Sequence, residues 1–219
     1  MSGAPLRLIL ASSSPRRQEL LARLGLPMTC VVPVIDETPA PNEPPVAHVQ
    51  RVALAKARAV ATTHPDEPIL AADTSVVLGD EVLGKPADLG DAAHMLTRLR
   101  GRAHTVLTAT AVAWAGRQAM HLDAVRVVFS PFTDDVLQWY LATGEHRDKA
   151  GAYALQGRGA LLVERVEGNV QAVVGLPLAR LPALFTAVGL RLAAAGDRLA
   201  LVGAPATPAE PIVASGQCP

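Results

Sequence analysis

Apolar residues recur along this chain in two alternating patterns, short continuous runs and helical stripes. Continuous apolar runs over residues 6–11, 28–34 and 69–78 predict buried strands. Apolar residues three and four positions apart predict helices over 15–24 and 46–63. Because strands and helices interleave, the pattern predicts an α/β fold.

The second half of the chain continues in the same way. Gly79 and Asp80 predict a turn into a short second arm of the preceding strand. The further expected elements are a helix over 88–99, strands over 105–114 and 121–129, a helix over 133–141 capped by Thr133, short strands over 161–166 and 171–174, and a helix over 177–195. We expect residues 1–195 to form one domain, and residues 196–219, rich in Pro and Ala, to form a mobile tail.

Composition narrows the classes of partner. Lys plus Arg and Asp plus Glu both total 20, and aromatic residues make up only 3% of the chain. A protein that coats nucleic acid needs excess positive charge, and one that binds single strands needs aromatic stacking. We therefore expect no nucleic-acid partner. No apolar run approaches the ~20 residues of a membrane span or forms a signal-peptide core, so we expect no membrane association and a cytoplasmic location.

Two arginines stand where a helix begins. Arg17 continues the apolar stripe of Leu20 and Leu24, and Arg16 shares its first turn. Cations at a helix N-terminus oppose the macrodipole. Beside free N–H groups and the serines at 12–14, they predict an anion site. The alternative is a solvated basic turn whose arginines extend into water.

The next helix carries a similar anomaly. Lys56 falls on the stripe of Val49, Ala53 and Val60. A lysine at such a position either extends its ammonium to solvent or faces a negative group. Both interpretations remain open from the sequence.

The clearest interruption is Asp73, within the apolar run ILAADTSVVL. A carboxylate is costly to bury unless a cation, a metal or several hydrogen-bond donors compensate it. A purely structural Asp that accepts backbone N–H groups is the alternative. Thr74 and Ser75 extend the polar cluster, which favours a functional site.

Weaker signals lie between and after these elements. Asp36 and Glu37 follow a predicted strand, where neighbouring side chains point to opposite faces, so we expect only one of them to enter a shared site. Lys85 lies in a Gly-Lys-Pro turn. Only three of the 20 cations are lysines, at positions 56, 85 and 149, and codon bias is the simplest explanation for that scarcity. There is no metal-binding histidine spacing, no Walker A motif and no GxSxG motif.

Together, these segments are similar to one known family. The motifs ASSSPRRQELL, IDET, AADT, GKP, DKAGAYALQG and VVGLPL occur in this order over about residues 6–190 and resemble the Maf family of nucleotide pyrophosphatases. The resemblance implies a two-lobed α/β fold with a mixed sheet and a central cleft, similar to inosine triphosphate pyrophosphatases. It also implies hydrolysis of a nucleoside triphosphate to monophosphate and pyrophosphate, a divalent metal (Mg or Mn), and a homodimer.

The resemblance also assigns roles to residues. It implies that Asp73 is the catalytic residue, with Glu37 and Asp73 at the metal. The residues that it implies in phosphate binding are Ser12, Arg17, Lys56 and Lys85. In one branch of the family, which prefers dTTP and UTP, three further positions match Arg16, Thr74 and Gln156 of this chain. The branch that acts on 7-methyl-GTP has Trp at the first of these positions, so the chain resembles the dTTP/UTP branch.

Two other functions remain as alternatives. A nucleotide-binding regulator linked to cell division could use the same cleft without turnover, and a Maf enzyme could act on 7-methyl-GTP. The presence of Asp73, Glu37, Lys56 and Lys85 together favours an enzyme. A role in removing modified nucleotides is an analogy with the family alone.

Overall fold

A mixed sheet of seven strands organises residues 4–204, the part of the chain that the computed structural model describes. Its strands are β1 (Leu8–Ala11), β2 (Met28–Val31), β3 (Ile69–Leu78), β4 (Glu81–Leu83), β5 (Ala103–Trp114), β6 (Arg117–Phe129) and β7 (Val163–Glu167). They lie in the order β2-β1-β3-β5-β6-β7, and β4 pairs with β3. β1 runs parallel to β2 and β3, whereas the other pairs are antiparallel. The predicted α/β class with a mixed sheet is confirmed.

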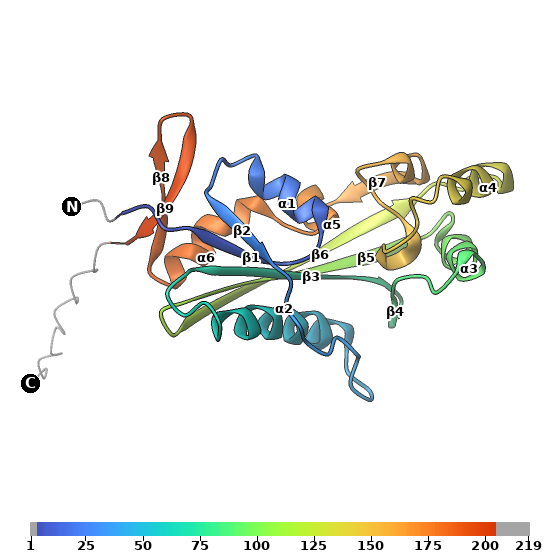
Figure 1. Ribbon diagram of the computed structural model, residues 1–219. Helices are drawn as coiled ribbons and strands as arrows, with labels where there is room; N and C mark the ends of the chain where they lie inside the picture. Colours follow the sequence, from blue (N-terminus) through green and yellow to red (C-terminus); the bar gives the residue numbers. More distant parts are fainter. Residues whose placement is uncertain (1–3, 205–219) are drawn as a thin grey trace, which may run out of the picture.

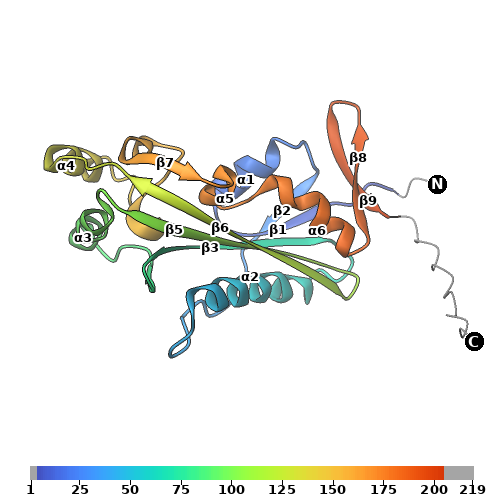
Figure 2. The ribbon, with the colours of Figure 1, turned by 180° about the vertical axis from the view of Figure 1, so that it is seen from behind.

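Helices cover both faces of this sheet, as Figures 1 and 2 show from opposite sides. They are α1 (Pro15–Ala22), α2 (Pro45–Ala61), α3 (Leu89–Leu99), α4 (Asp134–Ala142), α5 (Val170–Val174) and α6 (Leu181–Ala187), with the short 3-10 helices η1 (Ala150–Ala152), η2 (Arg158–Leu162) and η3 (Leu178–Arg180). α2 packs on one face of the sheet, and α1, α5 and α6 lie on the other face. α3 and α4 lie at the end of the sheet near β4 and β7. None of these helices is long and apolar enough to cross a membrane.

The continuous apolar runs reflect this two-sided cover. In β1, Leu8 and Leu10 are buried on the side of α1 and α6, while Ile9 and Ala11 are buried on the side of α2. Successive side chains of a strand point to opposite faces, so a strand covered on both sides needs apolar residues at every position. β1 and β3 are therefore found close to their expected places. The expected burial of residues 28–34 is wrong, because β2 ends at Val31 and lies at the edge of the sheet, with Cys30, Val32 and Val34 exposed.

The predictions for the C-terminal part are wrong in two places. Residues 171–174, expected as a strand, belong to α5, because the side chain of Asn169 caps a helical turn by accepting the Gln171 N–H at 3.0 Å. The expected helix over 177–195 ends with α6, and residues 190–195 instead form a strand. Gly189 lies between them with φ +85, a backbone conformation that glycine adopts without steric cost.

The predicted tail is also wrong over residues 198–203. These form β9 (Arg198–Gly203), which pairs antiparallel with β8 (Leu190–Ala195) as a separate hairpin. Leu201 is fully buried, and Leu199, two positions earlier, packs on the same core. Apolar residues at every second position are typical of a strand, but the alanines in this region obscure that alternation in the sequence. Residues 205–219 of the predicted tail lie outside the described part of the chain.

One edge of β3 remains open in the middle of the sheet. β1 pairs with β3 only as far as Ala71, and β4 begins to pair at Val76. Residues 72–75 therefore have β5 on one side and no strand on the other within the sheet described. This gap leaves the backbone at Asp73 and Thr74 without a neighbouring strand on that side, and their side chains alternate to opposite faces of β3.

Candidate active site

A cavity of about 850 Å³ opens at this free edge of β3. It brings together every residue to which the resemblance assigned a role, from elements far apart along the chain. The nine predicted site residues that line it are Ser12, Arg16, Arg17, Glu37, Lys56, Asp73, Thr74, Lys85 and Gln156. Their convergence supports one common site, while the role of each remains a prediction.

Two carboxylates and one ammonium form the acidic side of the cavity. Lys56, from α2, donates to Asp73 Oδ1 at 2.8 Å and to Glu37 Oε2 at 2.9 Å. Lys56 and Asp73 are only 7% and 8% exposed. Lys56 thus does not extend to solvent, because its ammonium faces negative groups across the α2 side of the sheet. A buried charge of this kind needs such compensation.

Glu37 enters the site and Asp36 does not. The Asp36 carboxylate is exposed and accepts the backbone N–H of Thr38 at 2.8 Å. Hydrogen bonding from Thr38 lowers the pKa of Asp36. The expectation that only one member of the acidic pair reaches the site is therefore confirmed.

Arg17 lies on the other face of β3 and is held by neutral acceptors. Its Nε donates to the carbonyl of Gly175 at 2.9 Å, and Nη2 donates to the hydroxyl of Thr74 at 3.1 Å. Nη1 lies 3.4 Å from the Ser12 hydroxyl. Thr108 fixes Thr74 in turn, with 3.0 Å between the two hydroxyls. Thr108 was not foreseen, although a Thr inside an apolar strand is the same kind of signal as Asp73.

The guanidinium of Arg17 has no carboxylate within ion-pair distance among residues 4–204. Burial lowers the pKa of Arg17, and the charge of Asp73 opposes this change. Arginine nevertheless stays protonated in proteins. A cation fixed by neutral acceptors beside a cavity keeps its charge available to an anion, and the anion site expected at this helix end stays a prediction.

The loop that carries Gln156 is held by a carboxylate that the sequence analysis did not consider. Glu145 accepts the backbone N–H groups of Arg158 and Gly159 at 2.8 and 2.9 Å. A side chain at Gly157 would collide with this carboxylate, since an added Cβ would lie 2.3 Å from Glu145 Oε2. An acidic residue directly before a glycine-rich stretch is the signal that could have identified it.

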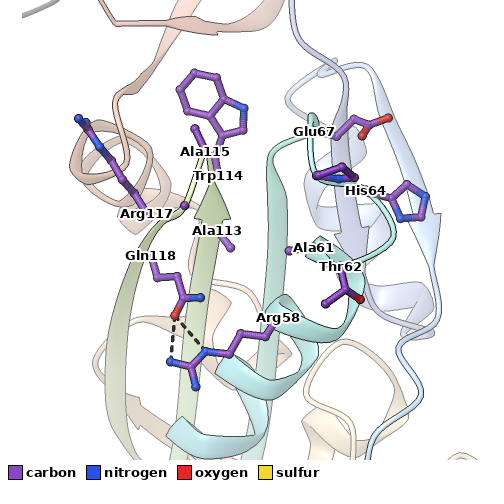
Figure 3. Close-up of a pocket in the computed structure, with 12 residues that line it drawn as sticks. Arg58, Ala61, Thr62, His64, Glu67, Ala113, Trp114, Ala115, Arg117 and Gln118 are labelled. Carbon is purple, nitrogen blue, oxygen red and sulfur yellow. Dashed lines mark hydrogen bonds between the residues drawn. The ribbon is translucent and has the colours of Figure 1, made fainter.

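A second, smaller hollow lies at the other end of α2 (Figure 3). It has a volume of about 350 Å³ and lies between the end of α2 and the β5–β6 turn. Arg58 there donates from both Nε and Nη2 to Gln118 Oε1, each at 3.0 Å. None of the nine predicted site residues lines this hollow.

Comparison with known proteins finds similar sequences over most of the chain. A dTTP/UTP pyrophosphatase of Anaeromyxobacter dehalogenans is 52% identical over 190 residues, which cover 85% of this chain and 96% of that protein. One of Symbiobacterium thermophilum is 48% identical over 183 residues, or 84% of this chain and 94% of that protein.

Among solved structures, a HAM1 protein from Coxiella burnetii aligns with a TM-score of 0.43 and 19% identity, over 58% of this chain and 74% of that one. The family model described as "Maf-like protein" matches residues 7–188, which include all nine predicted site residues. The chain belongs to the Maf-like protein family.

Proposed function

We propose that this protein is a nucleoside triphosphate pyrophosphatase that hydrolyses dTTP and UTP to the monophosphate and pyrophosphate. The observation that carries the proposal is the buried Asp73 carboxylate, held by Lys56 at 2.8 Å in a cavity whose remaining walls carry cations. The similarity to relatives named dTTP/UTP pyrophosphatase over most of the chain supports the same reaction.

The charges of the cavity match a triphosphate. Arg17 and Lys85 line it, and neither of them has an ion-pair partner within residues 4–204. A triphosphate is a dense anion, and its transition state spreads negative charge over the phosphoryl oxygens. Fixed cations stabilise that charge without reorganising during the reaction.

The acidic side of the cavity fits a divalent metal. Glu37 and Asp73 both lie within 3 Å of the same ammonium nitrogen, so two carboxylates already converge on one cation position. No cluster of three or more His, Cys, Asp or Glu residues suitable for a metal occurs within residues 4–204. Mg²⁺ is commonly held by one or two carboxylates together with substrate phosphates and water. When bound there, the metal would polarise the phosphoryl oxygens.

Asp73 has the position needed for a general base. Lys56 fixes one of its oxygens, and no hydrogen bond within the described residues occupies the other. Its free oxygen would take a proton from a water molecule as the water oxygen bonds to the α-phosphorus. The bond from the α-phosphorus to the bridging oxygen then breaks, and pyrophosphate leaves with the electron pair.

We propose that Arg16 and Gln156 select the base, since both line the cavity and neither is bonded to the Lys56 cluster of Asp73 and Glu37 within residues 4–204. Their guanidinium and amide groups suit the carbonyl and N–H edges of a pyrimidine. Thr74 is included in this proposal from the resemblance, although its hydroxyl also holds Arg17.

The substitution Arg16→Trp tests this selection. It should lower kcat/KM for UTP relative to 7-methyl-GTP by about 10-fold, the effect of one lost charged hydrogen bond. The measurement is kcat/KM for dTTP, UTP, GTP and 7-methyl-GTP in wild type and variant. Arg158→Met, at an exposed position outside the cavity lining, serves as a control that should leave the ranking unchanged. An unchanged ranking in Arg16→Trp would contradict the role of Arg16.

Removal of divalent metal should abolish turnover. With excess chelator we expect UTP hydrolysis to fall at least ~100-fold, because the phosphoryl charge is then no longer neutralised by a cation at the two carboxylates. Adding Mg²⁺ or Mn²⁺ should restore it. Glu37→Gln should raise the metal concentration needed for half-maximal rate. Full activity in chelator would rule out the proposed metal dependence.

A panel of canonical and modified nucleoside triphosphates, assayed for pyrophosphate release, tests the function as a whole. Binding of UTP without release of pyrophosphate would favour the alternative of a regulator without turnover. Homodimer formation, a cytoplasmic location and the absence of a nucleic-acid partner stay predictions.

A further inference from the structure

The third lysine of the chain, Lys149, also lines the cavity. It precedes η1, in the segment between Gly144 and Gly159 that also carries Gln156. Among the described residues, its ammonium donates only to the backbone carbonyl of Arg147, at 3.1 Å. Within residues 4–204 it forms no ion pair, although Asp148 is its neighbour in sequence. Lys149 is therefore a second lysine, after Lys85, whose charge the protein leaves uncompensated.

The backbone places these two lysines on adjacent loops. Gly151, two residues after Lys149, donates its N–H to the carbonyl of Gly84 at 3.0 Å, and Gly84 precedes Lys85. Gly151 has φ +65, and an added Cβ would lie 2.9 Å from Val76 Cγ1. Only glycine fits at position 151. The hydrogen bond from Gly151 to Gly84 joins the two loops near the point where β3 begins to pair with β4.

The segment around Lys149 also carries backbone strain. Asp148 and Ala152 both have positive φ, +57 and +61, although neither is a glycine. Such conformations cost about 1 kcal/mol or more each and persist where the surrounding structure enforces them, commonly at ligand sites. The surrounding structure thus fixes the backbone conformation on both sides of Lys149.

The electrostatic surroundings of Lys149 are unfavourable for a free ammonium. Burial lowers the pKa of Lys149, and the charges of Arg16 and Lys85 lower it further, while Asp148 and Glu145 oppose this change. Like charges gathered in one cavity repel one another until an anion neutralises them. The geometry and the charges therefore both indicate a multiply charged anion at Lys85 and Lys149.

We propose that Lys149 binds the phosphate chain of the substrate beside Lys85, at the two phosphates that leave as pyrophosphate. This inference rests on the proposed function. The α-phosphorus must lie near Asp73, where Lys56 is already bonded to both carboxylates. Lys85 and Lys149 form no ion pair or hydrogen bond with that cluster among the described residues, so they would hold the phosphates further from the reacting atom.

The inference is tested by product binding to Lys149→Met, which keeps a long side chain and removes its charge. The inhibition constant of pyrophosphate against UTP hydrolysis should rise about 10-fold, the effect of one charge-assisted hydrogen bond. The inhibition constant of UMP should change by less than about 2-fold, because a monophosphate lacks the two distal phosphates. Lys149→Arg should retain most of the affinity for pyrophosphate.

Arg147→Met is the matched control, because it removes a positive charge from the same loop at an exposed residue that does not line the cavity. It should bind pyrophosphate as wild type does. Equal weakening of pyrophosphate and UMP in Lys149→Met, or wild-type affinity for pyrophosphate, would overturn the inference. If thermal unfolding shows that this variant is not folded, Lys149→Gln is measured in the same way.

Failure of the proposed function gives a different result. A wild-type protein that releases no pyrophosphate from any nucleoside triphosphate would refute the function, and the assignment of leaving phosphates with it. A wild-type protein that hydrolyses UTP, together with a Lys149→Met variant that is inhibited normally by pyrophosphate, would refute the role of Lys149 alone.

Discussion

Asp73→Asn should lower pyrophosphate release from UTP at least ~100-fold, the usual contribution of a general base. The amide keeps the size of the carboxylate and can still accept a hydrogen bond from Lys56, whose Nζ lies 2.8 Å from Asp73 Oδ1 in the unmodified protein. It cannot take a proton from water. Turnover should therefore fall while the thermal unfolding curve stays cooperative. The measurement is kcat for UTP and dTTP, with unfolding followed by circular dichroism.

The chain offers a matched control for this substitution. Asp123 on β6 is also buried, and its carboxylate pairs with Arg180 at 3.3 Å, but it does not line the cavity. Asp123→Asn thus removes a buried carboxylate of the same kind and should keep kcat within about 2-fold of wild type. A rate near wild type in Asp73→Asn would exclude Asp73 as the base. An equal loss in both variants would instead indicate a general structural effect.

Lys56→Met should reduce both stability and activity. The substitution keeps a similar length and leaves the carboxylates of Asp73 and Glu37 without their shared cation. Breaking a buried ion pair by removing one partner costs about 3–5 kcal/mol. We expect the free energy of unfolding to decrease by about 3 kcal/mol, at the lower end of this range, because the Glu37 side chain is half-exposed and its carboxylate can be hydrated. Denaturant unfolding at neutral pH measures it.

Two further variants separate the ion pair from other effects of Lys56→Met. Arg58→Met changes an exposed cation on the same helix and should alter stability by less than about 0.5 kcal/mol. The double variant Lys56→Met with Asp73→Asn should recover part of the loss, because the unpaired buried charge is gone. If the two effects simply add, the ammonium and the Asp73 carboxylate do not stabilise each other.

Local patterns were sufficient for most of the sheet and for the choice of site residues. A strand covered on both faces has apolar residues at every position, and a helix on a sheet has an apolar stripe, so both are visible in short windows. Lys56, Asp73 and Arg17 were noticeable because each places a charge where that local pattern requires an apolar residue. The resemblance to the family added Gln156 and gave a role to Lys85, which the sequence marked only weakly, by its Gly-Lys-Pro turn.

The C-terminal hairpin shows where local patterns fail. Alanine-rich segments are compatible with helix, strand or coil, so residues 190–203 had no decisive period. Burial of Leu190 and Leu201 in the core around α1 and α6 decides in favour of a hairpin. Tertiary packing routinely overrides such weak local preference.

The site itself depends on contacts between distant parts of the chain. The pairing of Lys56 with Asp73 and Glu37, and the loop contact from Gly151 to Gly84, join segments that no sequence window contains together. The open edge of β3 exists only because β1 stops pairing at Ala71 and β4 starts at Val76. Local periodicity could therefore show which residues violate the rules for a buried core. Only the packed sheet decides which of those charges face one another, because the free energy of burying them depends on partners that the fold brings together.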